Sequence, residues 1–158
     1  MKKIGFLGLG VMGLPMALNV LKKSGYPVLG FDVAQARLDQ FAAAGGETTS
    51  DPVDIYKTCD VIMQMLPTHP IIINSIKQAV QYGKPGNIIL DLDSTAPDII
   101  QELYPEVEAA GMHLLDSPVS GGNPMAIAGT LAIMTGGDKA VFEEVKPLLE
   151  CMGHPVYT

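Results

Sequence analysis

The sequence predicts an α/β protein with a doubly wound, mostly parallel sheet that carries helices on both faces, in three layers. Two observations support this prediction. Short apolar runs alternate five times with segments whose apolar residues recur at helical spacing. In addition, the runs at residues 60–67 and 87–91 are apolar almost throughout, which is typical of strands buried on both faces of a parallel sheet. Because crossovers between parallel strands are right-handed, the linking helices pack back onto such a sheet.

Composition sets limits on what the chain can be. Its 158 residues have the length of one domain, and 47% of them are hydrophobic while 17% are charged, as in globular proteins. The formal net charge of −7 argues against nucleic acid or a membrane as a partner, and no apolar run reaches the roughly 18 residues of a membrane span. The two cysteines are too few for a disulfide framework, and the three histidines lack metal-ligand spacing. We therefore expect one cytoplasmic domain, residues 1–158, without a metal site.

The expected elements follow one another without a linker or an internal repeat. Residues 117–122 form a loop rich in small side chains. We expect strands at residues 4–7, 27–31, 60–67, 87–91, 112–116, 130–135 and 154–157, and helices at 12–23, 34–44, 70–82, 123–128 and 138–150, with two more helices that start near residues 51 and 94.

The first strand runs directly into three glycines spaced G-x-G-x-x-G, and a helix follows them. Gly8 allows a tight turn, Gly10 lets the backbone approach a pyrophosphate, and Gly13 lets the helix pack close to the strand. The start of the helix then offers N–H donors and a partial positive charge to the phosphates. Glycines also mark ordinary turns, but the position between a strand and a helix favours a dinucleotide site on a Rossmann-type fold.

Asp32 follows the second strand, 24 residues after Gly8, close to the spacing expected for the acid that binds the adenosine ribose. A carboxylate there accepts hydrogen bonds from the 2′- and 3′-hydroxyls and repels a 2′-phosphate. The sequence therefore favours NAD over NADP as the cofactor. Two observations leave alternatives open, because Asp32 could instead cap the following helix and Arg37 could assist a 2′-phosphate.

Three segments resemble the β-hydroxyacid dehydrogenases, of the 3-hydroxyisobutyrate dehydrogenase and tartronate semialdehyde reductase type. Residues 8–19 resemble the signature G-L-G-x-M-G-x-x-M-[AS]-x-N, and residues 65–68 resemble the M-L-P cofactor loop. Residues 116–131 resemble the substrate loop D-x-P-V-S-G-G…A…G-T-L. The matches keep the family's order over the whole chain. Asp93 departs from the pattern, since the family more often has a small or neutral residue there.

The resemblance implies an oxidoreductase that transfers a hydride between a nicotinamide cofactor and a small β-hydroxy acid or semialdehyde. Thr95 could alternatively cap a helix that begins T-x-x-D, and the Ser-Gly-Gly stretch could be a flexible turn. The residues that the resemblance assigns are Gly8, Leu9, Gly10, Val11, Met12 and Gly13 for the pyrophosphate, Asp32 for the ribose, Leu66, Pro67 and Thr95 for the nicotinamide side, and Ser120, Gly121 and Gly122 for the carboxylic acid substrate.

The family's catalytic residue has no counterpart in these 158 residues. That residue is a lysine in a K-x-x-N context, on a helix after the turn that would begin at Thr158. We therefore expect no catalytic residue here, an absent all-helical C-terminal domain, and a cofactor domain that is inactive alone. The full-length enzyme could be a homo-oligomer. A non-catalytic NAD-binding or interaction module, or a fragment of an imine-reductase-like enzyme, remains the alternative.

Overall fold

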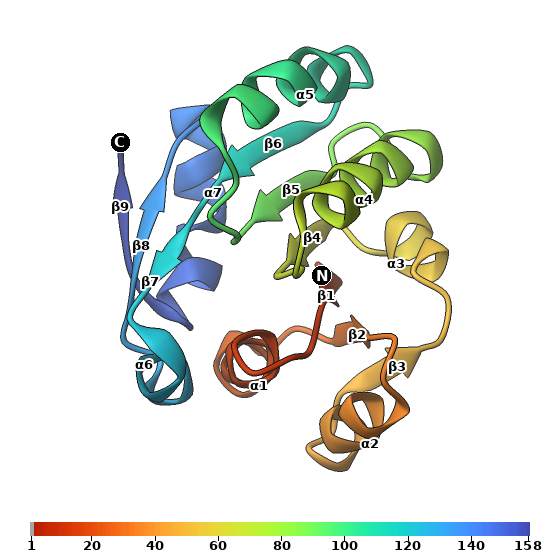
Figure 1. Cartoon of the computed structure of the whole chain (residues 1–158), viewed down its shortest axis with the longest axis vertical. Coiled ribbons are helices and arrows are strands. Elements are labelled where there is room, and N and C mark those ends of the chain that lie inside the picture. The colour runs from red at the N-terminus through yellow and green to blue at the C-terminus, as the bar shows by residue number, and fades with distance from the viewer. Residues whose placement is uncertain (1) are drawn as a thin grey trace.

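A computed structural model describes residues 2–158, and a central sheet of six parallel strands organises them (Figure 1). The strands lie in the order β3-β2-β1-β4-β5-β6, which confirms the predicted doubly wound sheet. The strand order changes direction between β1 and β4, and in such folds ligands bind outside the carboxyl ends of the strands at this point. The strands are β1 (Ile4–Leu7), β2 (Val28–Phe31), β3 (Glu47–Thr49), β4 (Val61–Gln64), β5 (Ile88–Asp91) and β6 (His113–Asp116).

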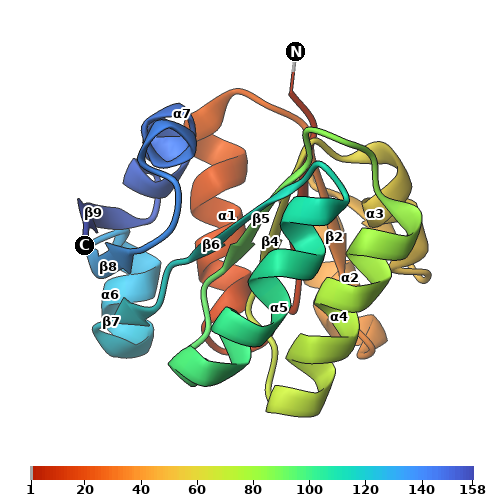
Figure 2. The same cartoon turned by 90° about the horizontal axis from the view of Figure 1, so that it is seen from above.

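Helices cover both faces of this sheet and complete the three predicted layers (Figure 2). Side chains alternate in direction along a strand, so Phe6 of β1 joins one apolar cluster while Leu7 joins the other. In the described residues, no helix is both long and apolar enough to cross a membrane. The first cluster is shared by α1 (Gly13–Ser24), α2 (Gln35–Ala43) and α7 (Lys139–Glu150), and the second by α3 (Val53–Thr58), α4 (His69–Tyr82) and α5 (Pro97–Ala109).

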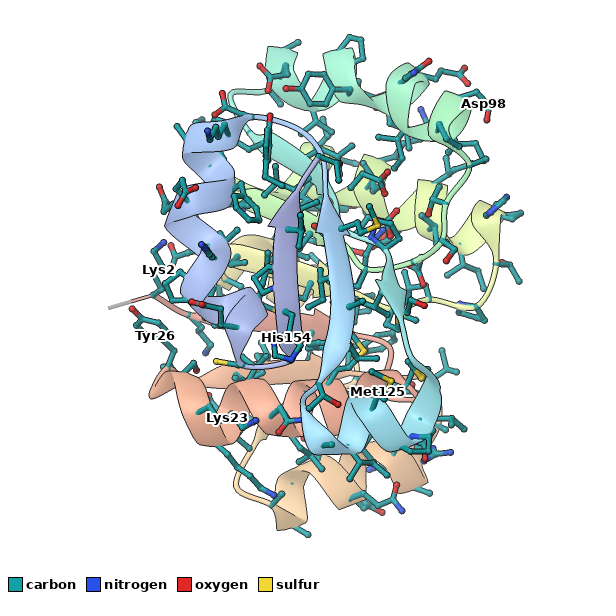
Figure 3. The ribbon with its side chains drawn as sticks, turned by 90° about the vertical axis from the view of Figure 1, so that its left-hand side faces the viewer. Lys2, Lys23, Tyr26, Asp98, Met125 and His154 are labelled. Carbon is teal, nitrogen blue, oxygen red and sulfur yellow. The ribbon has the colours of Figure 1, made fainter. Side chains whose placement is uncertain are left out.

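After β6 the chain forms a separate sheet of three strands, which faces the viewer in Figure 3. It consists of β7 (Val119–Ser120), β8 (Leu131–Thr135) and β9 (Gly153–Tyr157), and α6 (Gly122–Ala128) connects β7 to β8. β7 runs antiparallel to β8, whereas β9 is parallel to it. The helix α6 lies beside α1.

Two strands were not expected from the sequence. β3 lies at the edge of the large sheet, and its residues Glu47 to Thr49 are polar and mostly exposed. β7 has two residues and lies within the segment predicted as a loop. Neither strand has an apolar pattern, because neither is buried on both faces, so the periodicity that predicts the other strands is missing.

Candidate cofactor site

A cleft of about 430 Å³ lies where β1, β2 and β4 end, at the position that the fold favours for a ligand. Most of its lining is apolar. The cleft brings together eight residues predicted to bind the cofactor, namely Gly8, Gly10, Val11, Met12, Gly13, Asp32, Leu66 and Pro67. Phe31, Val33, Met65 and Ile71 complete the lining.

The three glycines of the loop have different structural reasons to be glycine. Gly8 has a φ of +96°, and a Cβ there would collide with the carbonyl oxygen of Met65. A Cβ on Gly13 would collide with the carbonyl oxygen of Gly8, so the close packing of α1 against β1 depends on its absence. A Cβ on Gly10 would have no neighbouring atom within 4 Å. Gly8 and Gly13 therefore shape the turn, while Gly10 keeps open space in the cleft.

The backbone between the last two glycines offers free hydrogen-bond donors. Within residues 2–158, the N–H groups of residues 10–13 have no hydrogen-bond partner, and the first bond of the helix runs from Leu14 N–H to the Gly10 carbonyl at 3.0 Å. The N–H groups before them are occupied, since Gly8 N–H donates to the Phe31 carbonyl at 2.9 Å. Free N–H groups at the start of a 12-residue helix, with its dipole behind them, form a site for a phosphate anion. The residues present thus fit a pyrophosphate.

The carboxylate of Asp32 stands next to this loop and holds it. Its Oδ2 accepts from Leu9 N–H at 2.7 Å, and its Oδ1 accepts from Ala34 N–H at 2.8 Å. Each oxygen keeps a further lone pair for a ligand hydroxyl. The N-cap of α2 is Ala34, with no side-chain cap, so the alternative of Asp32 as the N-cap residue is wrong.

Apolar side chains border the cleft on the solvent side. Val11, Val33 and Ile71 are 62%, 93% and 46% exposed, although large apolar side chains are usually buried. Exposed apolar side chains that border the same cleft are typical of a groove that binds a ligand. Sequence reasoning missed Val33 and Ile71, because one apolar residue after a strand or in the first turn of a helix has no pattern of its own.

Two predicted cofactor residues do not line the cleft. The side chain of Leu9 is buried in the apolar core, and only its N–H contributes, through Asp32. Thr95 is also buried, and its Oγ1 donates to Oδ2 of Asp91 at 2.6 Å. The alternative of Thr95 as a helix cap is wrong, since the N-cap of α5 is Ala96 without a side-chain cap. The buried Asp91 carboxylate needs donors, and it takes the hydroxyl that would otherwise cap the helix.

The sequence reasoning did not identify a pair of buried carboxyl groups at the end of β5. Asp91 accepts from Thr95 and also from Gln64 Nε2 at 3.3 Å. Both oxygens of Asp93 lie near Leu66 N–H, at 2.9 and 3.1 Å, so Asp93 connects β5 to the cleft lining. Burial, followed by the hydrogen bond and the charge of Asp91, raises the pKa of Asp93 to about 8. The position of Asp91 at the end of a buried strand, with Asp93 two residues after it, could have identified them, because ligands bind at that edge of the sheet.

The proposed substrate loop lies beside the glycine loop but outside the cleft lining. Gly121 and Gly122 have φ angles of +139° and +72°, which residues other than glycine rarely adopt. Ser120 is exposed. The Nδ2 group of Asn123 donates to the Val11 carbonyl at 2.8 Å and ties this loop to the glycine loop. Sequence reasoning missed Asn123, because nothing local indicates a partner 112 residues away.

A second hydrogen bond joins two segments of the family resemblance. Nδ2 of Asn19, the last residue of the signature in α1, donates to the carbonyl of Ala126 in α6 at 2.9 Å. The amide group of Asn19 is buried, so this bond satisfies a donor that would otherwise be costly in the core. Asn19 therefore helps to hold the predicted substrate loop against the cofactor cleft.

Comparison with known proteins agrees with this geometry. Residues 3–158 match the family described as the NAD binding domain of 6-phosphogluconate dehydrogenase. NAD-dependent L-serine dehydrogenase of Pseudomonas aeruginosa is 36% identical over 99% of this chain and 53% of its own. Human mitochondrial 3-hydroxyisobutyrate dehydrogenase is 38% identical over 97% of this chain and 46% of its own.

A solved structure gives the same result. The 3-hydroxyisobutyrate dehydrogenase of Mycobacterium tuberculosis, in a structure with L-serine, is 34% identical with a TM-score of 0.93, over 99% of this chain and 54% of that one. The chain thus spans about half the length of the curated relatives it matches. It belongs to the family of the NAD binding domain of 6-phosphogluconate dehydrogenase, which confirms the resemblance to the β-hydroxyacid dehydrogenases.

Proposed function

We propose that this chain is the cofactor domain of an oxidoreductase that transfers a hydride between a nicotinamide dinucleotide and a small β-hydroxy acid or semialdehyde. The observation that carries the proposal is the cleft itself, in which four free backbone N–H groups stand beside the open space at Gly10 and the carboxylate of Asp32. The cofactor would supply the redox chemistry, and the chain would bind and orient it.

The cleft residues suggest an orientation for the cofactor. The N–H groups of residues 10–13 would bind the pyrophosphate, and Asp32 would accept from the ribose hydroxyls. The exposed Val33 and Ile71 would pack against the adenine ring. Leu66 and Pro67 would then face the nicotinamide, and Thr95 would act from behind them through Asp91.

The charges along the cleft favour NAD over NADP. Asp32 is the single charged residue in the described lining, and it would repel a 2′-phosphate. Arg37 does not line the cleft, and its Nη1 group donates to Oε1 of Gln40 at 3.5 Å on the same helix. A 2′-phosphate would therefore meet a carboxylate, with no cation among the described lining residues to compensate for it.

The substrate part of the proposal rests on the neighbouring loop. Ser120, Gly121 and Gly122 would bind the carboxylate or hydroxyl of the acid with the serine hydroxyl and the backbone N–H groups, and Asn123 keeps them beside the glycine loop. The general acid/base would come from an all-helical second domain, because the relatives are about twice as long as this chain. The cytoplasmic location and the homo-oligomer are parts of the same proposal.

Calorimetric titration tests the cofactor assignment. We expect the chain to bind NADH more tightly than NADPH, and Asp32→Ala to weaken NADH binding about tenfold or more while reducing the preference. Asp39→Ala, an equal change of charge on the exposed side of α2, is the control and should behave as the native chain. Tighter binding of NADPH would show that the role given to Asp32 is wrong, and binding of neither cofactor would overturn the proposal.

Activity measurements test the catalytic part. We expect no turnover of 3-hydroxyisobutyrate or serine by these residues alone, and turnover when the second half of a relative is joined to them. Turnover by residues 1–158 alone would contradict the view that the acid/base residue lies outside them.

A further inference from the structure

The carboxyl group of Asp93 is buried but has few hydrogen-bond donors around it. The residue is 5% exposed, and the single N–H of Leu66 lies near both of its oxygens. An ionised carboxylate has about four lone-pair positions to satisfy, and burying one without donors or a counter-ion is unfavourable. This geometry suits a neutral carboxylic acid better than a carboxylate.

The neighbours of Asp93 add to this argument. Asp91, which is fully buried on β5, is the titratable group that acts on it, and Asp116 at the end of β6 also interacts with Asp91. Gln64 of β4 and Thr95 before α5 are neutral. Within residues 2–158, the three ion pairs involve other carboxylates, so no lysine, arginine or histidine compensates for the charge of Asp91 or Asp93.

We propose that Asp93 is a positioning residue that acts as a neutral acid, with one oxygen accepting from Leu66 N–H and the protonated oxygen donating to Asp91. In this state the acid holds segment 65–67, one side of the cleft, against the end of β5. This inference rests on the proposed function, because segment 65–67 is where the nicotinamide half of the cofactor would lie. It adds a pH-dependent control of cofactor binding.

The direction of the pH effect follows from the raised pKa of Asp93, about 8, which is due first to burial and then to the hydrogen bond and charge of Asp91. At neutral pH the acid is protonated. As the pH rises through about 8, Asp93 loses its proton, the donor to Asp91 disappears and two negative charges face each other. The repulsion pushes Asp93 away from Asp91, and segment 65–67, which stays bonded to Asp93 through Leu66 N–H, shifts with it, so NADH should bind less tightly at alkaline pH.

Titrations with NADH at several pH values between about 6 and about 9.5 test the inference in three proteins. The native chain should lose about tenfold in affinity across this range. Asp93→Asn keeps one donor and one acceptor but carries no charge, so its affinity should stay constant. Asp98→Asn makes the same change at an exposed position in the first turn of α5, labelled in Figure 3, and should follow the native profile. An equal loss of affinity in the native chain and in Asp93→Asn would overturn the inference.

An NMR titration of the chain without cofactor separates this inference from the proposed function. The Asp93 carboxyl carbon and the Leu66 amide should change together with a midpoint near pH 8. A midpoint near pH 4 for the Asp93 carboxyl carbon overturns the inference, even if the chain binds NADH. The inference is also overturned if Asp93 titrates near pH 8 while the affinity for NADH stays constant across the pH range. If the chain binds NADH at no pH, the proposed function is wrong. The midpoint shared by the Asp93 carboxyl carbon and the Leu66 amide still shows whether Asp93 is protonated at neutral pH.

Discussion

The glycine loop and the end of β5 lie at the same edge of the sheet, but they are constructed in opposite ways. The glycine loop offers backbone groups to a ligand, because the N–H groups of residues 10–13 have no partner in the described chain and Gly10 has no side chain. The end of β5 presents side chains, and there Asp91 and Asp93 are enclosed and bonded to Gln64, Thr95 and Leu66.

The contrast matches the two halves of the proposed cofactor. A pyrophosphate needs donors and room, which glycine and a helix start provide without any charged side chain. A nicotinamide ring needs a surface of fixed shape, and side-chain hydrogen bonds from a neighbouring strand can provide one. Substitutions in the two regions should therefore differ in their effects on stability and on cofactor affinity.

The largest effect is expected for Gly13→Ala. The added Cβ collides with the Gly8 carbonyl oxygen, which is backbone and cannot move aside without separating α1 from β1. We expect a loss of about 3 kcal/mol or more in the free energy of unfolding, measured with urea. A native unfolding midpoint would mean that the helix does not need this close approach.

Gly10→Ala should separate binding from stability. Its Cβ meets no atom of the protein within 4 Å, so the free energy of unfolding should change by less than about 0.5 kcal/mol. The same methyl group occupies the space proposed for the pyrophosphate, and NADH affinity should fall about tenfold to a hundredfold. Calorimetry and urea unfolding on one preparation give both values. If Gly10→Ala binds NADH as tightly as the native chain does, the phosphates of the cofactor lie elsewhere.

Asp93→Asn should change how stability depends on pH. The folded-state pKa of Asp93 is raised to about 8, so between about pH 4 and 8 the folded chain holds a proton that the unfolded chain releases. The contribution of this group to stability is therefore present at low pH and is lost as the pH rises through that window. Relative to the native chain, the Asn variant should gain stability steadily from about pH 5.5 to about pH 8 and change little above it, seen as a difference in Tm that rises and then levels off. A constant difference would indicate a purely structural change.

Asn123→Ala should have the smallest effect. It removes an exposed hydrogen bond to the Val11 carbonyl, a loss of about 1 kcal/mol or less in stability, with an NADH affinity reduced about threefold at most. Asn74→Ala on the exposed side of α4 is a matched control. If the two variants bind NADH equally well, the link between the loops does not contribute to cofactor binding.

Most of the fold could be predicted, because its signals are local. Buried parallel strands such as β4 and β5 are continuous apolar runs, and the helix faces repeat at helical spacing. β3 and β7 escaped prediction, since an exposed edge strand and a two-residue strand have no apolar pattern. The glycine loop and Asp32 could also be predicted, because their spacing follows from the strand–helix–strand unit itself.

The rest of the site depends on burial and on contacts between distant segments. Thr95 fits a helix cap in the sequence, but its hydroxyl bonds to Asp91, four residues before it, because the sheet buries that carboxylate. Asp93 departs from the family pattern without a visible role until its contact with Leu66, 27 residues away, is known. No local pattern encodes the pair of Leu66 and Asp93, because it forms only when β4 and β5 take their register.

Most strands and helices, the turn at Gly8 and the place of Asp32 after β2 follow from the sequence alone. These features follow from backbone sterics and apolar periodicity, which act over a few residues. The folded chain was needed to show which carboxyl groups are buried together, which cleft residues remain exposed and which side chains join the two loops. Those features depend on desolvation and on hydrogen bonds between segments that are far apart in the chain, such as Leu9 with Asp32, 23 residues apart, and Val11 with Asn123, 112 residues apart.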